Sequence, residues 1–440
     1  MGIPETQFSE TALGSGEGKD AGSNQTVYLA LANGKVFEGK GFGATGDITG
    51  ELVFTTAMTG YLETLTDPSY EGQIVLQTFP LIGNYGVISE DFEKDKIGPS
   101  AYIVKYPSRT PSNFRNEGTL DALLKERGII GLCDIDTREL TKIIRESGVM
   151  NGKIKTTPPT EEDFEEVRAH RLTRPVPVVS TQVQQFFPLE DEVFKVGPFE
   201  GTKEAALARP RHTLALLDTG AKENIRHELH KRGADVHVFP WDCNPEDILA
   251  LKPDGIMLPN GPGDPLDNTD IADTLAAVIG SGIPIFGICL GHQLLALAHG
   301  FKTEKLKYGH RGSNQPVKDV HTGKVYITSQ NHGYCVSQDS IDPAIAEEWI
   351  VSVNDGTNEG IIYKDAPIFS VQFHPEASGG PRDTEYLFDI FFQIIDDYKA
   401  GKTITSESYI RAEEITNADA KARSTREVKK DAGADLKGGA

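Results

Sequence analysis

The chain lacks the features that mark disulfide-rich, zinc-stabilised and membrane-spanning proteins. Its 440 residues include only four cysteines (Cys133, Cys243, Cys289 and Cys335), which are far apart and form no Cys-x-x-Cys pair. Neither a disulfide framework nor a zinc site is therefore expected, and this cysteine usage fits a reducing compartment. No apolar run approaches the ~18 residues that a membrane span needs.

Positive charge is also scarce. The sequence has 44 Lys and Arg against 65 Asp and Glu, and this net charge of −21 argues against bulk binding of nucleic acid. Arginine is absent from the first hundred residues, and the N-terminus lacks the basic and apolar regions of a signal peptide. We therefore expect a cytoplasmic protein.

Nucleotide-binding fingerprints are missing too. Residues 41–46 match Gly-x-Gly-x-x-Gly, but a turn and a strand are predicted after them, where a dinucleotide fingerprint needs a helix. We interpret this segment as a glycine-rich turn. Gly401-Lys402-Thr403 has no glycine before it at the spacing of a phosphate loop. We expect no cofactor and no metal ion on this chain.

Composition divides the chain into five parts. Residues 1–26 and 399–440 are polar, with few large apolar side chains, and predict a disordered leader and a disordered tail. Residues 27–154 combine short strand-like runs with a helix capped by Asp136, which predicts a smaller mixed β/α N-terminal domain. Prolines interrupt residues 155–211, which we interpret as a connector.

Residues 212–398 alternate strand and helix patterns. This rhythm predicts an α/β domain, an open and mostly parallel sheet with helices on both faces. Strands are predicted at residues 214–217, 235–239, 255–258, 283–288, 324–328, 350–353 and 368–373, and helices at 223–231, 245–251, 271–279 and 386–398.

The most informative segment is the strand–turn–helix around Cys289. The apolar run 283–288 leads into Gly287-Ile288-Cys289-Leu290-Gly291, and a helical pattern follows until Gly300. A cysteine flanked by glycines at a tight turn between a strand and a helix is typical of a nucleophile elbow. The helix N-terminus behind the sulfur favours the reactive thiolate. Cys289 is therefore a candidate nucleophile rather than an inert buried cysteine.

A base and its orienting group follow another strand. His374 and Glu376 lie two residues apart after the strand 368–373, so their side chains can lie side by side. A carboxylate there would hold the imidazole tautomer and stabilise the charged ring. Strand C-terminal ends meet at one edge of a parallel sheet, so we expect both residues near Cys289.

Two loop-like segments could complete the pocket. Residues 259–265 follow a predicted strand, and their glycines allow backbone amides to approach a ligand closely or to form an oxyanion hole. Residues 330–334 follow the strand 324–328 and are either a pocket wall or a plain hairpin loop.

These residues resemble the class I glutamine amidotransferases, in Gly287-Ile288-Cys289-Leu290-Gly291-His292-Gln293 together with His374-Pro375-Glu376. Over about residues 27–398 the chain is similar to one family in that class, the small subunits of carbamoyl phosphate synthetases. The motifs specific to it include Asp218-x-Gly220-x-Lys222-x-Asn224, Thr66-Asp67-Pro68-Ser69-Tyr70, Ile82-Gly83-Asn84-Tyr85-Gly86 and Ser112-Asn113-Phe114-Arg115. Ser313 and Gln315 stand where the family pattern has Gly and His.

The resemblance implies an enzyme that hydrolyses L-glutamine through Cys289 as nucleophile, His374 as general base and acid, and Glu376 as its orienting group. It also implies that glutamine is bound by Ser69, Gly261, Gly263, Leu290, Gln293, Asn331, Gly333 and Tyr334. Ammonia would pass to a separate large synthetase subunit in a heterodimer or higher oligomer. ATP and magnesium would bind that partner, which makes carbamoyl phosphate from bicarbonate.

Two alternatives are considered. An amidotransferase subunit that feeds a different synthetase would lack the motifs of the N-terminal block. A silent scaffold subunit would usually have lost a member of the catalytic triad, and here Cys289, His374 and Glu376 are all present.

Overall fold

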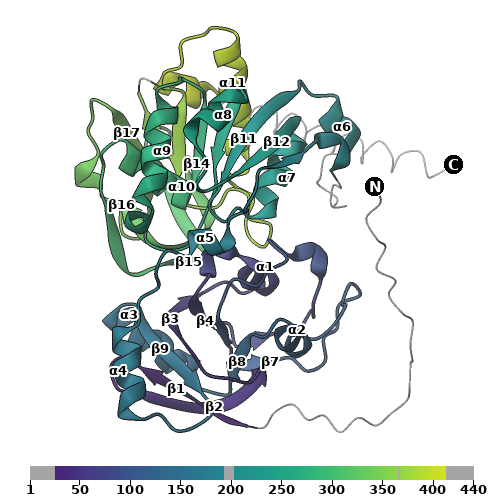
Figure 1. Ribbon diagram of the computed structural model, residues 1–440, viewed down its shortest axis with the longest axis vertical. Coiled ribbons are helices and arrows are strands. Elements are labelled where there is room, and N and C mark those ends of the chain that lie inside the picture. Colours follow the sequence, from purple (N-terminus) through teal and green to yellow (C-terminus); the bar gives the residue numbers. More distant parts are fainter. Residues whose placement is uncertain (1–24, 193–202, 365, 413–440) are drawn as a thin grey trace, which may run out of the picture.

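The computed structural model describes residues 25–192, 203–364 and 366–412, and Figure 1 shows them as two lobes packed against each other. Most of the predicted leader and residues 413–440 of the predicted tail lie outside the described residues. The described part contains no helix that is both long enough and apolar enough to cross a membrane.

The N-terminal lobe is a closed β-barrel. Its strands follow one another around the barrel in the order β1 (Thr26–Leu31), β2 (Val36–Gly43), β8 (Ile130–Cys133), β6 (Ala101–Ile103), β4 (Gln73–Gln77), β3 (Ile48–Thr55) and β9 (Met150–Lys155). The other elements of this lobe are α1 (Tyr61–Thr66), η1 (Pro68–Tyr70), β5 (Leu81–Ile82), η2 (Ser89–Asp91), β7 (Tyr106–Pro107), α2 (Leu120–Glu126) and α3 (Thr137–Ser147).

Local sequence signals explain α3 well. The Asp136 side chain accepts a hydrogen bond from the Glu139 N–H (2.8 Å), and Gly148 ends the helix with a φ of 93°. The predicted capped helix is therefore confirmed.

The predicted glycine-rich turn at residues 41–46 is wrong. Gly41 and Gly43 belong to β2, which pairs with β8. A side chain on Gly43 would lie 2.7 Å from the Ile129 carbonyl oxygen, so glycine serves the close approach of two strands here.

The C-terminal lobe is built on a ten-stranded sheet. Its order is β10 (Gln185–Phe187), β12 (Ala234–Pro240), β11 (His212–Asp218), β13 (Gly255–Leu258), β14 (Ile285–Ile288), β19 (Ile368–Val371), β18 (Asn358–Tyr363), β17 (Ala346–Ser352), β15 (Thr303–Asp319) and β16 (Val325–Val336). Strands β12 through β19 in this order are parallel, and the remaining pairs are antiparallel.

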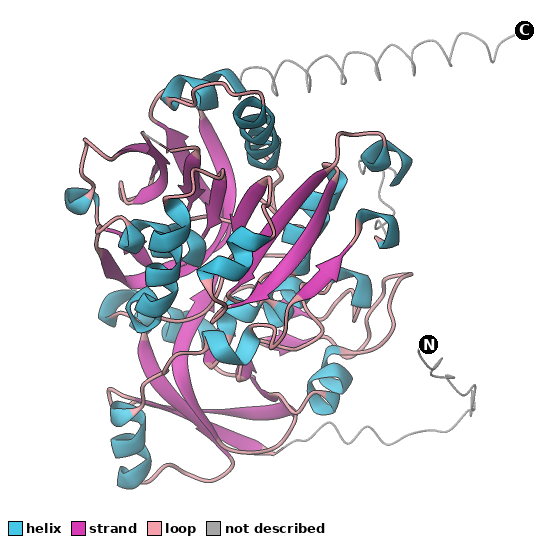
Figure 2. Ribbon diagram, turned by 45° about the horizontal axis from the view of Figure 1, so that its top comes forward, coloured by secondary structure: helices cyan, strands magenta, loops and turns pink. Residues whose placement is uncertain are grey.

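Helices cover both faces of this sheet, which confirms the predicted α/β class (Figure 2). The sheet is mixed rather than mostly parallel, because four of its pairings are parallel and five are antiparallel. One face packs against α7 (Glu223–Lys231) and α11 (Tyr386–Lys399), and the other against α8 (Pro245–Ala250), α9 (Thr269–Ile279) and α10 (Leu290–Ala298). The remaining helices and 3-10 turns are α4 (Glu161–Ala169), α5 (Val176–Val179), η3 (Leu189–Asp191), α6 (Lys203–Leu207), η4 (Pro265–Asn268) and η5 (Gln338–Ser340).

Two expectations about connecting segments need correction. The predicted connector contributes β10, an antiparallel edge strand of the C-terminal sheet. Residues 330–334 are not a loop but the central part of β16, which sequence reasoning ended at residue 328. Polar side chains face a pocket along this part of the strand, so the alternation of apolar and polar residues that predicts a strand is missing from its sequence.

Strand β15 joins the two lobes. Its Lys307 carbonyl accepts from the Val149 N–H (2.8 Å), and its Arg311 carbonyl accepts from the Thr56 N–H (3.3 Å). Lys305 pairs with Glu51 of β3 (2.8 Å). The edge of the C-terminal sheet therefore lies against the open end of the barrel.

The predicted disordered tail starts too early. Residue 399 ends α11, and residues 406–412 are helical, with Tyr409 and Ala412 fully buried in the core. The Tyr409 ring packs edge-on against Phe369 at 5.4 Å between centroids and lies 6.4 Å from Trp349. Two apolar side chains in a polar stretch are too weak a sequence signal for this docking.

Replacing Tyr409 will separate packing from hydrogen bonding. Tyr409→Ala is expected to lower the free energy of unfolding by about 3–5 kcal/mol, because a buried aromatic ring is lost from a close-packed core. Tyr409→Phe is expected to be neutral or stabilising, since the buried hydroxyl has no hydrogen-bond partner among the described residues. Urea denaturation measures both changes, and equal losses in the two variants would contradict the described packing.

Candidate active site

Cys289 occupies a strained turn between β14 and α10. Its φ of 56° and ψ of −103° are unusual for a residue with a side chain. The Cys289 N–H donates to the Val371 carbonyl of β19 (2.8 Å), which fixes the turn to the sheet. A side chain on Gly291 would collide with the Leu258 carbonyl, so the second glycine of the motif is required by packing. The expected nucleophile elbow is thus formed.

His374 and Glu376 lie as the spacing predicts. The His374 N–H donates to the Ser329 carbonyl (2.9 Å), and His374 Nδ1 lies 2.6 Å from Glu376 Oε1. Both side chains are buried. The Glu376 carboxylate therefore holds the proton on Nδ1, and Nε2 has no hydrogen-bond partner among the described residues. That nitrogen is free for proton transfer.

Charge couples His374 to Cys289. Burial and the Lys222 ammonium lower the pKa of His374, but Glu376 and the Cys289 thiolate raise it more, to about 10. Burial raises the pKa of Glu376, and His374 and Lys222 outweigh this effect and lower it. The arrangement thus favours a charged imidazole at His374.

A buried lysine lies behind this pair. Lys222 Nζ lies 3.3 Å from His374 Nδ1, 3.5 Å from Glu376 Oε1 and 3.5 Å from Asp67 Oδ2. Asp67 comes from the barrel lobe, and its Oδ2 also accepts from Asn331 Nδ2 (3.1 Å). Burial lowers the pKa of Lys222, but Asp67 and Glu376 raise it well above its usual value. The ammonium therefore stays charged between the two lobes.

A cavity of about 630 Å³ opens at Cys289. Seven of the eight residues expected to bind substrate line it together with Cys289, namely Ser69, Gly261, Gly263, Gln293, Asn331, Gly333 and Tyr334. Leu290 is not in its lining, because its side chain packs into the core of the C-terminal lobe. The Leu290 N–H, however, has no acceptor among the described residues, whereas the next N–H donates to the Pro259 carbonyl.

Hydrogen bonds orient several of these side chains. Gln293 Nε2 donates to the Tyr334 carbonyl and to Gln372 Oε1, both at 2.9 Å. Ser69 Oγ accepts from Asn260 Nδ2 (2.9 Å), so Ser69 of the barrel lobe is tied to the loop 259–265. The cavity wall therefore needs both lobes.

Sequence reasoning gave no role to several residues of this site. Asp67 and Lys222 were noted only as parts of family motifs, and the connector residues 170–173 and Arg311 were not considered as cavity lining. The sequence signal for Lys222 is slight, because a buried lysine cannot be told from an exposed one before the positions of its charged partners are known.

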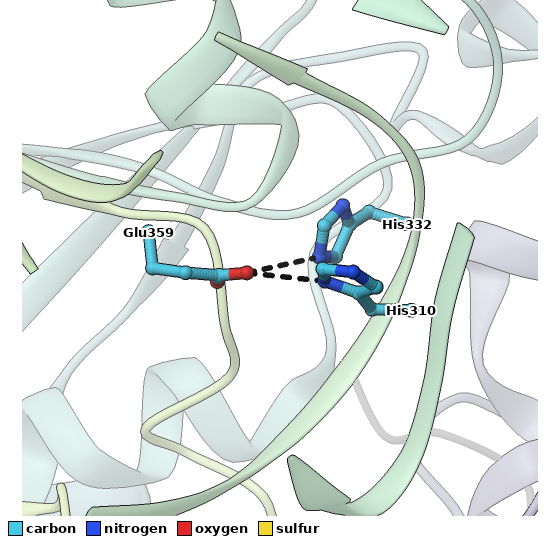
Figure 3. Close-up of side chains that lie close together, drawn as sticks. All are labelled: His310, His332 and Glu359. Carbon is cyan, nitrogen blue, oxygen red and sulfur yellow. Dashed lines mark hydrogen bonds and ion pairs between the residues drawn. The ribbon is translucent and has the colours of Figure 1, made fainter. Parts of the chain in front are cut away.

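One set of side chains in the described residues has donor atoms close enough to hold a metal ion. Figure 3 shows His310 of β15, His332 of β16 and Glu359 of β18 turned toward one another. Glu359 Oε1 lies 3.1 Å from His310 Nδ1, and His310 Nε2 lies 2.8 Å from Asp355 Oδ2. A protonated His310 that donates its Nδ1–H to Glu359 and its Nε2–H to Asp355 accounts for these contacts without a metal ion.

Comparison with known proteins identifies both lobes. The family model "Glutamine amidotransferase class-I" matches residues 215–394, and the model "Carbamoyl-phosphate synthase small chain, CPSase domain" matches residues 29–154. A "Carbamoyl phosphate synthase small chain" from Bacillus caldolyticus is 46% identical over 86% of this chain and 98% of that protein. A small chain of the same name from Fusobacterium nucleatum is 46% identical over 84% of this chain and 98% of its own length.

A third relative carries a narrower name. The "Carbamoyl phosphate synthase pyrimidine-specific small chain" of Bacillus subtilis is 47% identical over 84% of this chain and 95% of that protein. The resemblance inferred from the motifs is therefore confirmed over nearly the whole described chain.

The His310 cluster predicts a pH-dependent stability. Burial lowers the pKa of His310, but Asp355 and Glu359 raise it more, to about 9, against 6.5 in an unfolded chain. Its contribution, about 3 kcal/mol at most, is then complete below pH 6.5 and is lost as the pH rises through 9. Urea denaturation at pH 6.5 and 9.5 should show this loss in the wild type and not in His310→Gln. The exposed His321→Gln is the matched control, and an identical pH dependence in all three proteins would refute the assignment.

Proposed function

Because the chain belongs to the family of carbamoyl phosphate synthase small chains, we propose that Cys289, His374 and Glu376 hydrolyse L-glutamine and that the released ammonia passes to a separate large synthetase chain. The observation that carries the first part is the Cys289 turn in the wall of a cavity lined by both lobes, with the buried His374 close enough to interact with its sulfur.

The chemistry follows from the charges of the pair. The Cys289 thiolate attacks the side-chain carboxamide carbon of glutamine, and a tetrahedral intermediate forms. Protonated His374 gives its Nε2 proton to the amide nitrogen, the C–N bond breaks, and ammonia leaves. His374 then takes a proton from water, which attacks the glutamyl thioester, releases glutamate and restores the thiolate. Glu376 keeps the imidazole oriented throughout.

An oxyanion site stands beside the nucleophile. The free N–H of Leu290 lies at the start of α10, where the helix dipole also favours negative charge. We assign the Leu290 backbone, and not its side chain, to substrate binding. One such donor contributes roughly 3 kcal/mol of transition-state stabilisation in hydrolases.

Replacing the nucleophile tests the assignment. Cys289→Ser is expected to lower glutamine-dependent carbamoyl phosphate synthesis by about 1000-fold or more, because a serine hydroxyl is a far weaker nucleophile here. Synthesis from added ammonium by the complex with the large chain should remain, since that route bypasses the thioester. Cys243→Ser is the control. Glutamine use that survives in Cys289→Ser would identify a different nucleophile.

Two further cavities support ammonia transfer. A small cavity of about 60 Å³ lies on the His374 side, lined by Asp67, Glu93, Lys222 and Asn331 among others. It shares Gly60, Ser313 and Gly379 with an open cavity of about 690 Å³. Asn331 also lines the cavity at Cys289, so this residue separates a substrate side from an exit side. We propose the exit side as the route of ammonia.

The mouth of this route is also the proposed docking face for the large chain. The open cavity is lined by Met58, Asn113 and Arg115, and Phe114 lies between the last two. Met58 is 69% exposed and Phe114 95% exposed, which is unusual for large apolar side chains. The large chain would supply ATP, magnesium and the synthetase reaction, while this chain needs no cofactor of its own for glutamine hydrolysis.

Polar substitutions on this face test the docking proposal. The double variant Met58→Ser/Phe114→Ser is expected to raise the Kd for the large chain at least about 10-fold, because two exposed apolar anchors are lost. Glutamine hydrolysis by the isolated chain should be unchanged. Leu207→Ser, on α6 at the far edge of the C-terminal lobe (Figure 1), is the matched control. Calorimetric titration measures both Kd values, and an unchanged Kd in the double variant would place the docking face elsewhere.

A further inference from the structure

Arg311 is a buried cation in the wall of the Cys289 cavity. It lies on β15, is only 5% exposed, and lines the cavity together with Cys289 and Gln293. Its Nη1 donates to the Tyr308 carbonyl (2.8 Å), and its buried Nε has no hydrogen-bond partner within the described part of the chain. A side chain built on Gly333 would lie 3.2 Å from Nη2, so the guanidinium fills the space that Gly333 leaves open.

No carboxylate of the described residues lies within 4 Å of this guanidinium. The groups that face it are Tyr70, Glu51, Cys289 and Tyr334. Glu51 is already paired with Lys305 at 2.8 Å and accepts from Gln73 Nε2. Burial lowers the pKa of Arg311, which is the direction expected of a cation removed from water without an ion-pair partner.

Arg232 shows how the same chain treats a buried guanidinium that has a structural role. It is 6% exposed and donates to Asp389 (2.8 and 3.0 Å) and to Glu228 (2.6 Å). Burying a guanidinium without such partners is unfavourable, because its charge is taken out of water without compensation. Arg311 therefore has the burial of a structural arginine and lacks the carboxylates.

We propose that Arg311 binds the α-carboxylate of glutamine and makes this cavity specific for the free amino acid. The inference rests on the proposed glutaminase function and adds a residue outside the expected substrate-binding set. A guanidinium presents parallel N–H donors that match a carboxylate, and the pairing is strong where water is excluded. The arriving carboxylate supplies the partner that Arg311 lacks.

A role in stabilising the Cys289 thiolate is the rival explanation. The thiolate already has a cationic partner in His374, and a single sulfur anion does not use the planar fork of a guanidinium. The two roles differ in what they affect, because a carboxylate contact matters only for substrates that carry the carboxylate.

A pair of substrates separates these roles. Glutamine and 4-aminobutanamide have the same side-chain carboxamide, and the second lacks only the α-carboxylate. Ammonia release from each is measured with the wild type, Arg311→Gln and Arg311→Lys, alone and with the large chain. Lys318→Met, which removes an exposed cation of the same strand outside the cavity, is the matched control.

Arg311→Gln is expected to lower kcat/KM for glutamine about 30-fold or more, mainly through KM, and to change the value for 4-aminobutanamide less than about 3-fold. Arg311→Lys should fall between, since it keeps the charge without the fork. Lys318→Met should leave the ratio between the two substrates unchanged. Equal losses for both substrates, or a fall in kcat at constant KM, would overturn the proposal.

Binding without turnover keeps the test independent of catalysis. Cys289→Ser and Cys289→Ser/Arg311→Gln are titrated with both compounds by calorimetry, and their thermal unfolding is compared. The added substitution should weaken glutamine binding about 30-fold and leave 4-aminobutanamide binding unchanged. Equal weakening would refute the role of Arg311. A wild type that binds glutamine and never releases ammonia would instead refute the proposed function.

Discussion

The active site depends on one buried ammonium. Lys222 lies between Asp67 of the barrel lobe and the Glu376–His374 pair of the C-terminal lobe. Four charged groups from different parts of the chain are thereby taken out of water together, and removal of one partner from such a cluster leaves uncompensated charge worth about 3–5 kcal/mol. The orientation of His374, the proposed general base, is therefore tied to the docking of the two lobes.

The fold and the contact between His374 and Glu376 could be predicted where local rules decide. Helix α7 and strand β13 have the predicted bounds, because their apolar periods are undisturbed. Cys289, His374 and Glu376 were found from glycine spacing and from the two-residue repeat of an extended chain. The partners of Lys222 and the surroundings of Arg311, which has no paired carboxylate among the described residues, could not be predicted from the sequence. Both depend on how β11, β15 and the barrel pack against one another.

Long-range packing also explains the errors. The predicted strand ended before residues 330–334 of β16, because these residues are polar on the side that faces the cavity. No strand was predicted at β10, because it lies in a proline-rich stretch. Residues 406–412 looked solvated, although Tyr409 completes the aromatic cluster beneath α11. In each case a local pattern was outweighed by a tertiary contact.

Asn331 lines both the cavity at Cys289 and the cavity at His374, and this position bears on how substrate and products would move through the molecule. In the proposed function, glutamine enters the cavity at Cys289, and ammonia leaves through the cavity that His374 lines. The glutamyl group, still bound to sulfur, would then leave through the cavity by which glutamine entered. The proposed arrangement would give ammonia a separate exit, so that nitrogen crosses the chain in one direction.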